Sequence, residues 1–185
     1  MPKYISGGNL LIDPIFVLKK SGLVADMKIA DLGCGGAGHF VLPAAQMVGN
    51  KGVVYAVDVL KTALAGVESK AKMEGLSNIE YIWSDLEVLG GTKVEAESLD
   101  VALLINVLFQ TKEHQNIFQE AKRLLKPGSK LLVIDWSETG SPFGPSAETR
   151  IKKEEVKKLA QAVGLKELEE FSVGDYHYGL IFQKV

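Results

Sequence analysis

Residues 31–38 read Asp-Leu-Gly-Cys-Gly-Gly-Ala-Gly and decide how the rest of the sequence is interpreted. The stretch follows a short apolar run at 28–32 and precedes a segment with helical periodicity at 39–48. Glycine suits such a loop because the backbone turns tightly there and a ligand can approach where a Cβ would clash. Three glycines satisfy the pattern G-x-G-x-x-G between strand and helix: Gly33, Gly35 and Gly38.

An acidic residue stands at the spacing that such a loop requires. Asp58 ends the next predicted strand, 52–58, and follows Gly38 by 20 residues. A carboxylate in that place can accept hydrogen bonds from both hydroxyls of a ribose. The alternative is a tight turn with incidental glycines and a solvent-facing Asp58, but four glycines in six residues together with the spaced acid argue against it. We therefore expect a nucleoside-containing cofactor.

The charge of Asp31 discriminates between a dinucleotide and a cofactor without phosphate. It lies two residues before Gly33, at the end of the strand, where a dinucleotide would place its pyrophosphate near the helix N-terminus. Two unit charges about 5 Å apart interact by about 3 kcal/mol at an effective dielectric constant near 20, and the sign is repulsive for a phosphate. S-adenosylmethionine carries an ammonium and a sulfonium and no phosphate. Asp31 therefore favours S-adenosylmethionine over NAD.

Apolar runs alternate with helical segments along most of the chain, a pattern typical of a parallel sheet covered by helices. The last two strands are separated by only four residues, so we expect them to form an antiparallel hairpin. Pro127-Gly128 is expected to end the fourth helix before the fifth strand begins. We expect strands at 28–32, 52–58, 79–84, 99–105, 131–136, 165–171 and 176–183, and helices at 13–21, 39–48, 60–71, 117–125 and 156–163.

Length and composition indicate one compact domain over residues 1–185. Hydrophobic residues make up 46% and charged residues 24%, which excludes disorder and collagen-like structure. The single cysteine, Cys34, excludes an internal disulfide and a multi-cysteine metal site, and favours the cytoplasm. The longest apolar runs, 101–105 and 107–109, are far shorter than the roughly 20 residues of a spanning helix. We therefore expect no membrane span and no bound metal.

The charge balance disfavours a general nucleic-acid binder. The formal net charge is −2, and only Arg123 and Arg150 are arginines. A run of lysines at 152–158 could attract an anionic surface, but Glu154 and Glu155 are interleaved with it. The run is therefore expected to be a solvated helix face.

Five stretches together resemble the class I S-adenosylmethionine-dependent methyltransferase family, in its ubiquinone/menaquinone-biosynthesis-type branch. They are Asp-Leu-Gly-Cys-Gly at 31–35, Val-Tyr-Ala-Val-Asp at 54–58, Trp-Ser-Asp-Leu at 83–86, Leu-Asp-Val at 99–101 and Leu-Leu-Lys-Pro-Gly at 124–128. The resemblance implies an α/β Rossmann-like three-layer sandwich. Its seven-stranded, mostly parallel sheet would have the order 3-2-1-4-5-7-6, with strand seven antiparallel. Ala37 stands where the family usually carries its third glycine, which predicts a loop one residue longer.

The resemblance also implies a cofactor site. Asp31 and the backbone of Gly33 and Gly35 would face the methionine part, Asp58 the ribose and Asp85 the adenine amino group. Leu86 would donate its backbone N–H to the adenine, and Asn106 would lie near the methionine ammonium. Cys34 is expected to pack beneath the cofactor as a small residue, not to act as a nucleophile, since no base accompanies it. The implied set is Asp31, Gly33, Cys34, Gly35, Asp58, Val59, Ser84, Asp85, Leu86 and Asn106.

By this resemblance the reaction is methyl transfer from S-adenosylmethionine, with S-adenosylhomocysteine as product, to a small-molecule acceptor that the sequence does not identify. Asn106 is followed by Val-Leu-Phe, so the Asn-Pro-Pro-Tyr motif of amine methylation on nucleic-acid bases is missing. RNA or protein methylation, a non-catalytic S-adenosylmethionine-binding module and an NAD-dependent dehydrogenase remain alternatives. Acceptor-side candidates are Trp136, Glu138, the loop 140–150 and His177-Tyr178, and residues 7–9 could close over the cofactor.

Overall fold

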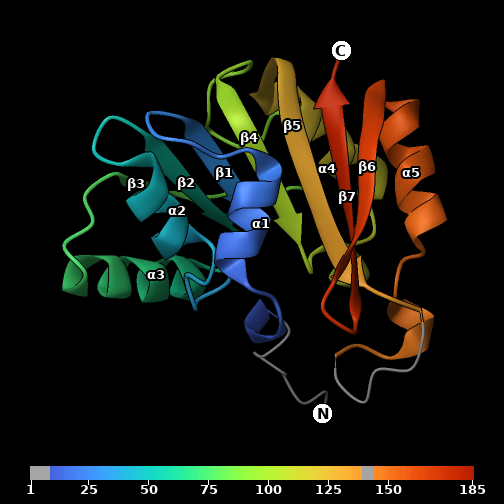
Figure 1. The fold of residues 1–185 in the computed structure, drawn as a ribbon, viewed down its shortest axis with the longest axis horizontal. Helices are drawn as coiled ribbons and strands as arrows, with labels where there is room; N and C mark the ends of the chain where they lie inside the picture. The colour runs from blue at the N-terminus through green and yellow to red at the C-terminus, as the bar shows by residue number, and fades with distance from the viewer. Residues whose placement is uncertain (1–8, 139–143) are drawn as a thin grey trace.

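The computed structural model describes residues 9–138 and 144–185, and a seven-stranded sheet runs through its centre (Figure 1). The strand order is β3-β2-β1-β4-β5-β7-β6. β7 is antiparallel to β5 and β6, and the other pairs are parallel. Sheet order and strand directions confirm what the resemblance implied. The strands are β1 (Lys28–Leu32), β2 (Val53–Asp58), β3 (Ile79–Trp83), β4 (Leu99–Ile105), β5 (Leu125–Trp136), β6 (Leu165–Val173) and β7 (His177–Lys184).

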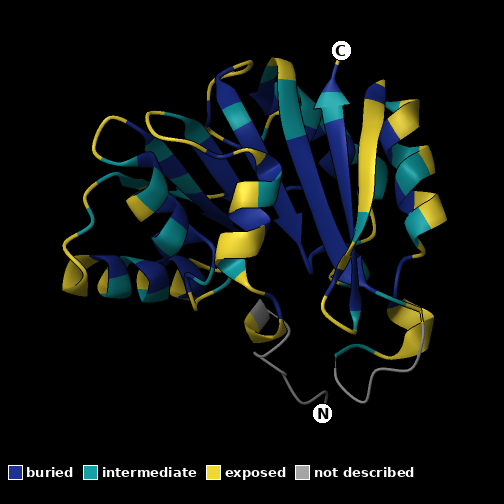
Figure 2. Ribbon diagram, in the orientation of Figure 1, coloured by how far each residue is buried: buried dark blue, intermediate teal, exposed yellow. Residues whose placement is uncertain are grey.

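Helices cover both faces of the sheet and complete a three-layer sandwich. The first three pack into one apolar cluster and the last two into another, on opposite faces. Figure 2 shows the central strands buried and the outer faces of the helices exposed. With both faces covered, the middle strands are almost continuously apolar. The helices are α1 (Pro14–Ser21), α2 (Val41–Val48), α3 (Lys61–Met73), α4 (His114–Leu124) and α5 (Lys153–Ala162).

The ends of α1 follow directly from its sequence. The Asp13 carboxylate accepts hydrogen bonds from the backbone N–H groups of Ile15 and Phe16, at 2.9 and 3.2 Å. Pro14 occupies the first helical position, and Gly22 ends the helix with φ +83°. This helix packs in front of the sheet in the view of Figure 1.

The sheet positions the site because the chain changes direction between β1 and β4. After β1 it runs outward through β2 to β3, and it then returns to β4 on the other side of β1. The carboxyl ends of these strands face a common edge, where open α/β sheets bind their ligands. The connection 85–97 contains no helix, as expected. Glu120 of α4 holds it by accepting the N–H groups of Gly90 and Thr92, at 2.7 and 3.0 Å.

The predicted boundary between the fourth helix and fifth strand was wrong. α4 ends at Leu124, and β5 begins at Leu125, with Pro127 and Gly128 inside it. The ladder to β4 pairs Leu99 with Leu125 and then Val101 with Lys130, so the extra residues of β5 form a bulge. Proline cannot donate to a ladder and is tolerated at such a bulge. In addition, α2 begins at Val41, two residues later than expected.

Candidate functional site

The glycine loop leaves the end of β1 and is tied to the end of β2. The N–H groups of Gly33 and Cys34 donate to the carbonyl oxygen of Val57, at 2.8 and 3.0 Å. Gly33 has φ +85°, and a Cβ there would lie 2.5 Å from a methyl carbon of Val107, just after β4. Gly35 has φ +63°, and a Cβ there would meet no described atom within 4 Å. Gly33 is therefore needed for packing, whereas Gly35 leaves the backbone open to a ligand.

Asp58 holds this loop as well as ending β2. It is 9% exposed; one carboxylate oxygen accepts the N–H of Gly35 at 2.9 Å, and the other accepts the N–H of Leu60 at 2.9 Å. Each carboxylate oxygen has two acceptor positions, so ribose hydroxyls can bind beside these backbone bonds. The ribose contact of Asp58 stays a prediction.

Asp31, at the end of β1, is a buried carboxylate with a raised pKa. It is 3% exposed, and among the described residues its Oδ2 has no hydrogen-bond partner. Burial, and then the negative charge of Asp58, raise the pKa of Asp31 from 3.8 to about 7. A buried carboxylate without a partner is costly. The arrangement fits a ligand that brings a positive charge to Asp31 and hydroxyls to Asp58.

Cys34 is enclosed by the loop and does not resemble a nucleophile. It is 2% exposed. Burial, followed by the negative charges of Asp31 and Asp58, raises the pKa of its thiol above its usual value. Because the thiolate is the reactive form, this environment keeps the thiol inert.

The predicted adenine-side residues lie around the ends of β2 and β3 but differ in their exposure. The N–H of Ser84 donates to the carbonyl oxygen of Asp58 at 3.1 Å, which joins the two strand ends. Asp85 is exposed and accepts the N–H of Glu87 at 2.9 Å. The Leu86 side chain lies in the core, so only its backbone is suited to a ligand. Val59 is 54% exposed and lies directly after Asp58.

Asn106 follows β4 in a left-handed conformation, with φ +56°. Its N–H donates to the carbonyl oxygen of Ile134 at 2.8 Å, which ties it to β5. The next residue, Val107, contacts Gly33 as described above. Asn106 therefore lies at the border between the glycine loop and the end of β5.

The sequence analysis missed Asp135, which is buried at this edge as Asp31 and Asp58 are. Asp135 is 0% exposed and accepts the N–H groups of Leu108 and Trp136, at 3.1 and 2.8 Å. Burial raises its pKa to about 7, although hydrogen bonds from backbone N–H groups oppose the rise. By accepting the N–H of Leu108, Asp135 holds the start of the short helix η2 (Leu108–Gln110), which follows Asn106. The signal was available: like Asp58, it is a polar residue at the end of an apolar strand.

The acceptor-side candidates Trp136 and His177 lie side by side, at the C-terminal end of β5 and the N-terminal end of β7. Trp136 is paired with His177 across the two strands, and their rings lie 4.2 Å apart. Glu138 forms an ion pair with Lys152 at 3.1 Å. The expected closing segment at 7–9 lies outside the described residues except for Asn9, and so does part of the loop 140–150.

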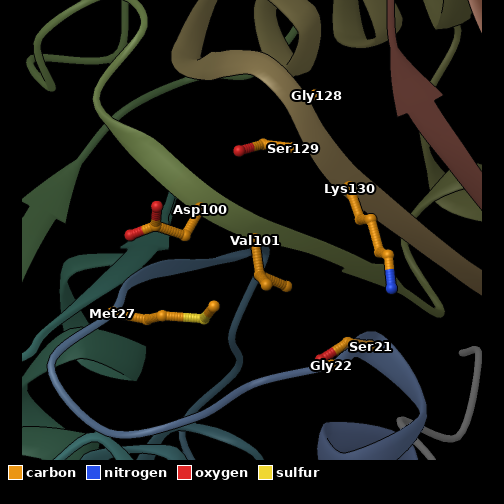
Figure 3. Close-up of a pocket in the computed structure, with 8 residues that line it drawn as sticks. All are labelled: Ser21, Gly22, Met27, Asp100, Val101, Gly128, Ser129 and Lys130. Carbon is orange, nitrogen blue, oxygen red and sulfur yellow. The ribbon is translucent and has the colours of Figure 1, made fainter.

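The hollow drawn in Figure 3 lies at the opposite edge of the sheet. Its volume is ≈ 180 Å³, and its lining includes Asp100 and Lys130 from the first parts of β4 and β5, and Gly22 at the end of α1. Asp100 is already engaged there, because it accepts the N–H of Lys28 and pairs with Lys126 at 2.6 Å. This hollow therefore lies apart from the glycine loop and Asp58.

Within residues 9–138 and 144–185, no group of three or more His, Cys, Asp or Glu residues is placed to hold a metal ion. No helix in this part of the chain is long and apolar enough to cross a membrane. Three lysines of the run 152–158 are paired with acids: Lys152 with Glu138, and Lys153 and Lys157 with Glu170.

The sequence of this chain is similar to those of known proteins. A family model described as "Methyltransferase domain" matches residues 23–177. The demethylmenaquinone methyltransferase of Lactococcus lactis is 29% identical over 126 residues, 68% of this chain and 48% of that protein. The ubiquinone/menaquinone biosynthesis C-methyltransferase UbiE of Shewanella oneidensis is 28% identical over 66% of this chain and 47% of its own length. The chain thus spans about half the length of these curated relatives.

Solved structures agree with the family match. A SAM-dependent methyltransferase from Aquifex aeolicus superimposes with a TM-score of 0.88 at 28% identity, covering 97% of this chain and 94% of that one. Phosphoethanolamine N-methyltransferase 2 of Haemonchus contortus, in complex with S-adenosyl-L-methionine, gives a TM-score of 0.75 over 92% of this chain and 52% of that one. At 16% identity that second match supports the fold alone. The chain belongs to the class I S-adenosylmethionine-dependent methyltransferase-domain family.

Proposed function

We propose that this chain transfers the methyl group of S-adenosylmethionine to a small, planar aromatic acceptor. One observation carries the cofactor assignment: the buried Asp31 carboxylate, with its Oδ2 unpartnered among the described residues, lies beside Asp58 at the glycine loop. A cationic nucleoside satisfies both groups, since its ammonium pairs with Asp31 and its ribose with Asp58. The pyrophosphate of NAD would instead be repelled by Asp31.

The proposed chemistry is an in-line displacement. S-adenosylmethionine supplies a methyl group on a sulfonium; the sulfur keeps the electron pair of the broken bond, and the acceptor releases a proton as its new bond to the methyl forms. The protein's contribution is orientation and exclusion of water. Asp31 and Asn106 would hold the methionine end, Asp58 the ribose, and Asp85 with the N–H of Leu86 the adenine.

The acceptor assignment rests on the relatives and on charge. The relatives are named for methylation in quinone biosynthesis, which supports a ring acceptor. An RNA acceptor lacks support, because lysines of the most basic run are paired with Glu138 and Glu170. We also propose a cytoplasmic location, which the unpaired, buried Cys34 supports.

Calorimetric titration tests the cofactor assignment. We expect S-adenosylmethionine and S-adenosylhomocysteine to bind and NAD not to bind. Asp58→Asn should weaken binding, because an amide cannot accept from the N–H groups of both Gly35 and Leu60 and has fewer acceptor positions for a ribose. Asp175→Asn, at an exposed acid of the β6–β7 turn, is the matched control. Binding of NAD alone, or equal binding by Asp58→Asn and wild type, would contradict the proposal.

A further inference from the structure

We propose that His177 and Trp136 form the wall that binds the methyl acceptor, with the imidazole of His177 hydrogen-bonded to a hydroxyl group on the acceptor's ring. This inference rests on the proposed methyl transfer and adds the residues that would select the acceptor. It would make His177 a binding residue and requires no proton transfer to it.

The first argument is the state of the His177 side chain. It is 3% exposed, and both ring nitrogens lack a hydrogen-bond partner among the described residues. Buried polar atoms in folded proteins are nearly always hydrogen-bonded, and an orphaned one costs stability. Oδ2 of Asp31 is in the same condition at the same edge of the sheet. A bound ligand would relieve both groups.

The second argument is location. β7 lies two strands from β4, so at a typical strand spacing their ends are about 10 Å apart. His177 pairs with Trp136, at the carboxyl end of β5, and Asn106 is hydrogen-bonded to the same strand at Ile134. The imidazole thus belongs to the edge that carries the glycine loop, at a separation that a one- or two-ring molecule can span.

Neighbouring contacts enclose this part of the edge. His39, between the glycine loop and α2, bonds through its Nε2 to the carbonyl oxygen of Ile12 at 2.8 Å. On the other side, a Cβ on Gly174 in the β6–β7 turn would lie 3.4 Å from the carbonyl oxygen of Leu11. The segment before α1 therefore bridges the glycine loop and the hairpin that carries His177.

The third argument is chemistry. Trp136 is 2% exposed, and its ring lies 4.2 Å from the imidazole, at 40° to it. The guanidinium of Arg150 lies over the Trp136 ring, 5.6 Å from its centre. Burial, and then Arg150, lower the pKa of His177 to about 4, so the imidazole is neutral at pH 7. A neutral imidazole offers one N–H donor and one acceptor, which matches a hydroxyl.

A hollow of ≈ 240 Å³ adjoins the buried His177 on the side of α5. His177 lines this hollow together with Ser137, Tyr178 and the Lys153–Glu170 pair. Tyr178 is used otherwise, since its hydroxyl donates to the carbonyl oxygen of Ile151 at 3.0 Å. His177 contributes two buried ring nitrogens that have no hydrogen-bond partner among the described residues.

The test uses two matched probes on protein loaded with S-adenosylhomocysteine. The first is 1,4-dihydroxynaphthalene, and the second is 1,4-dimethoxynaphthalene, which has the same ring system but no O–H group. In a Trp83→Phe background, Trp136 is the sole tryptophan and reports binding by fluorescence. We expect the diol to quench the fluorescence of Trp136. It should also bind at least about tenfold more tightly than the diether, because a tenfold difference in affinity corresponds to the contribution of one hydrogen bond.

Two variants complete the test. His177→Phe keeps a ring and removes both nitrogens, so it should erase the preference for the diol while keeping the affinity for S-adenosylhomocysteine and raising the midpoint of thermal unfolding. His177→Asn keeps hydrogen-bonding atoms and should restore part of the preference. An unchanged preference in His177→Phe, or no quenching of Trp136 by the diol in the Trp83→Phe protein, overturns the inference. Failure of S-adenosylhomocysteine to bind wild type would instead overturn the proposed function.

Discussion

Replacing Asp31 by asparagine should stabilise the ligand-free protein and weaken its cofactor binding. Asparagine has the same shape and no charge, so it removes the buried carboxylate and leaves the packing. Raising the pKa from 3.8 to about 7 makes the ionised form about 4 kcal/mol less favourable in the folded chain than in the unfolded chain. This cost is small at pH 4, grows as the pH rises and is complete above about pH 7.

The sign follows from proton binding. Between pH 4 and 7 the folded state keeps a proton on Asp31 that the unfolded state has lost, so wild type loses stability as the pH rises. Asp31→Asn lacks this loss. Its advantage over wild type should therefore grow by about 1.4 kcal/mol per pH unit across this window. Urea denaturation at several pH values measures the difference, with Asp175→Asn as the control at an exposed acid.

Cofactor binding should show the opposite preference, because an ammonium pairs with the ionised form of Asp31. With a pKa of about 7 in the free protein, affinity for S-adenosylhomocysteine should rise about 25-fold from pH 5.5 to 7.5. Asp31→Asn should bind more weakly and lose most of this pH dependence. If the stability difference stays constant with pH, or if both proteins show the same binding profile, the assigned state of Asp31 is refuted.

Three further changes test the packing around the site. Gly33→Ala should destabilise the fold by at least about 2 kcal/mol, since φ is +85° and the new Cβ meets Val107; adding Val107→Ala should recover part of this loss in thermal unfolding. Glu120→Ala should cost about 3 kcal/mol in urea denaturation, because Arg123 loses its ion pair at 2.7 Å and loop 85–97 its anchor. Cys34→Ala should preserve methyl transfer, and a thiol reagent should modify wild type only after unfolding; modification of the native protein would contradict this.

Local patterns predicted the elements but not their arrangement in the sheet. Apolar runs and glycine stops placed α1 and the strands closely, because each signal is contained within about ten residues. Strand order came from the resemblance, since periodicity carries no information about which strands are neighbours. The predicted start of β5 was wrong, because a Pro-Gly pair such as Pro127-Gly128 occurs both at the end of a helix and at a β-bulge. Only the pairing of Leu99 with Leu125 distinguishes them.

The sequence likewise predicted which residues belong to the site but not their contacts. The spacing of Asp58 from the glycines predicted its place, but not its hydrogen bonds to Gly35 and Leu60, which require the loop to fold back onto β2. Gly33 was assigned to ligand approach, and the structure adds packing against Val107. Such contacts join residues far apart in sequence. A motif shows that they belong to one site without showing what each one touches.

Asp135, which the sequence analysis missed, can be found by combining the sequence with the strand ends. The first five strands each place a polar residue close to their carboxyl end: Asp31, Asp58, Asp85, Asn106 and Asp135. Four are acids in a chain whose formal net charge is only −2, so negative charge is concentrated at one edge. Two of them have pKa values raised to about 7, which shows that this edge holds its charges at a cost in the ligand-free state. A cationic ligand lowers that cost and a phosphate raises it, so the strand ends favour a sulfonium cofactor over a dinucleotide independently of the glycine pattern.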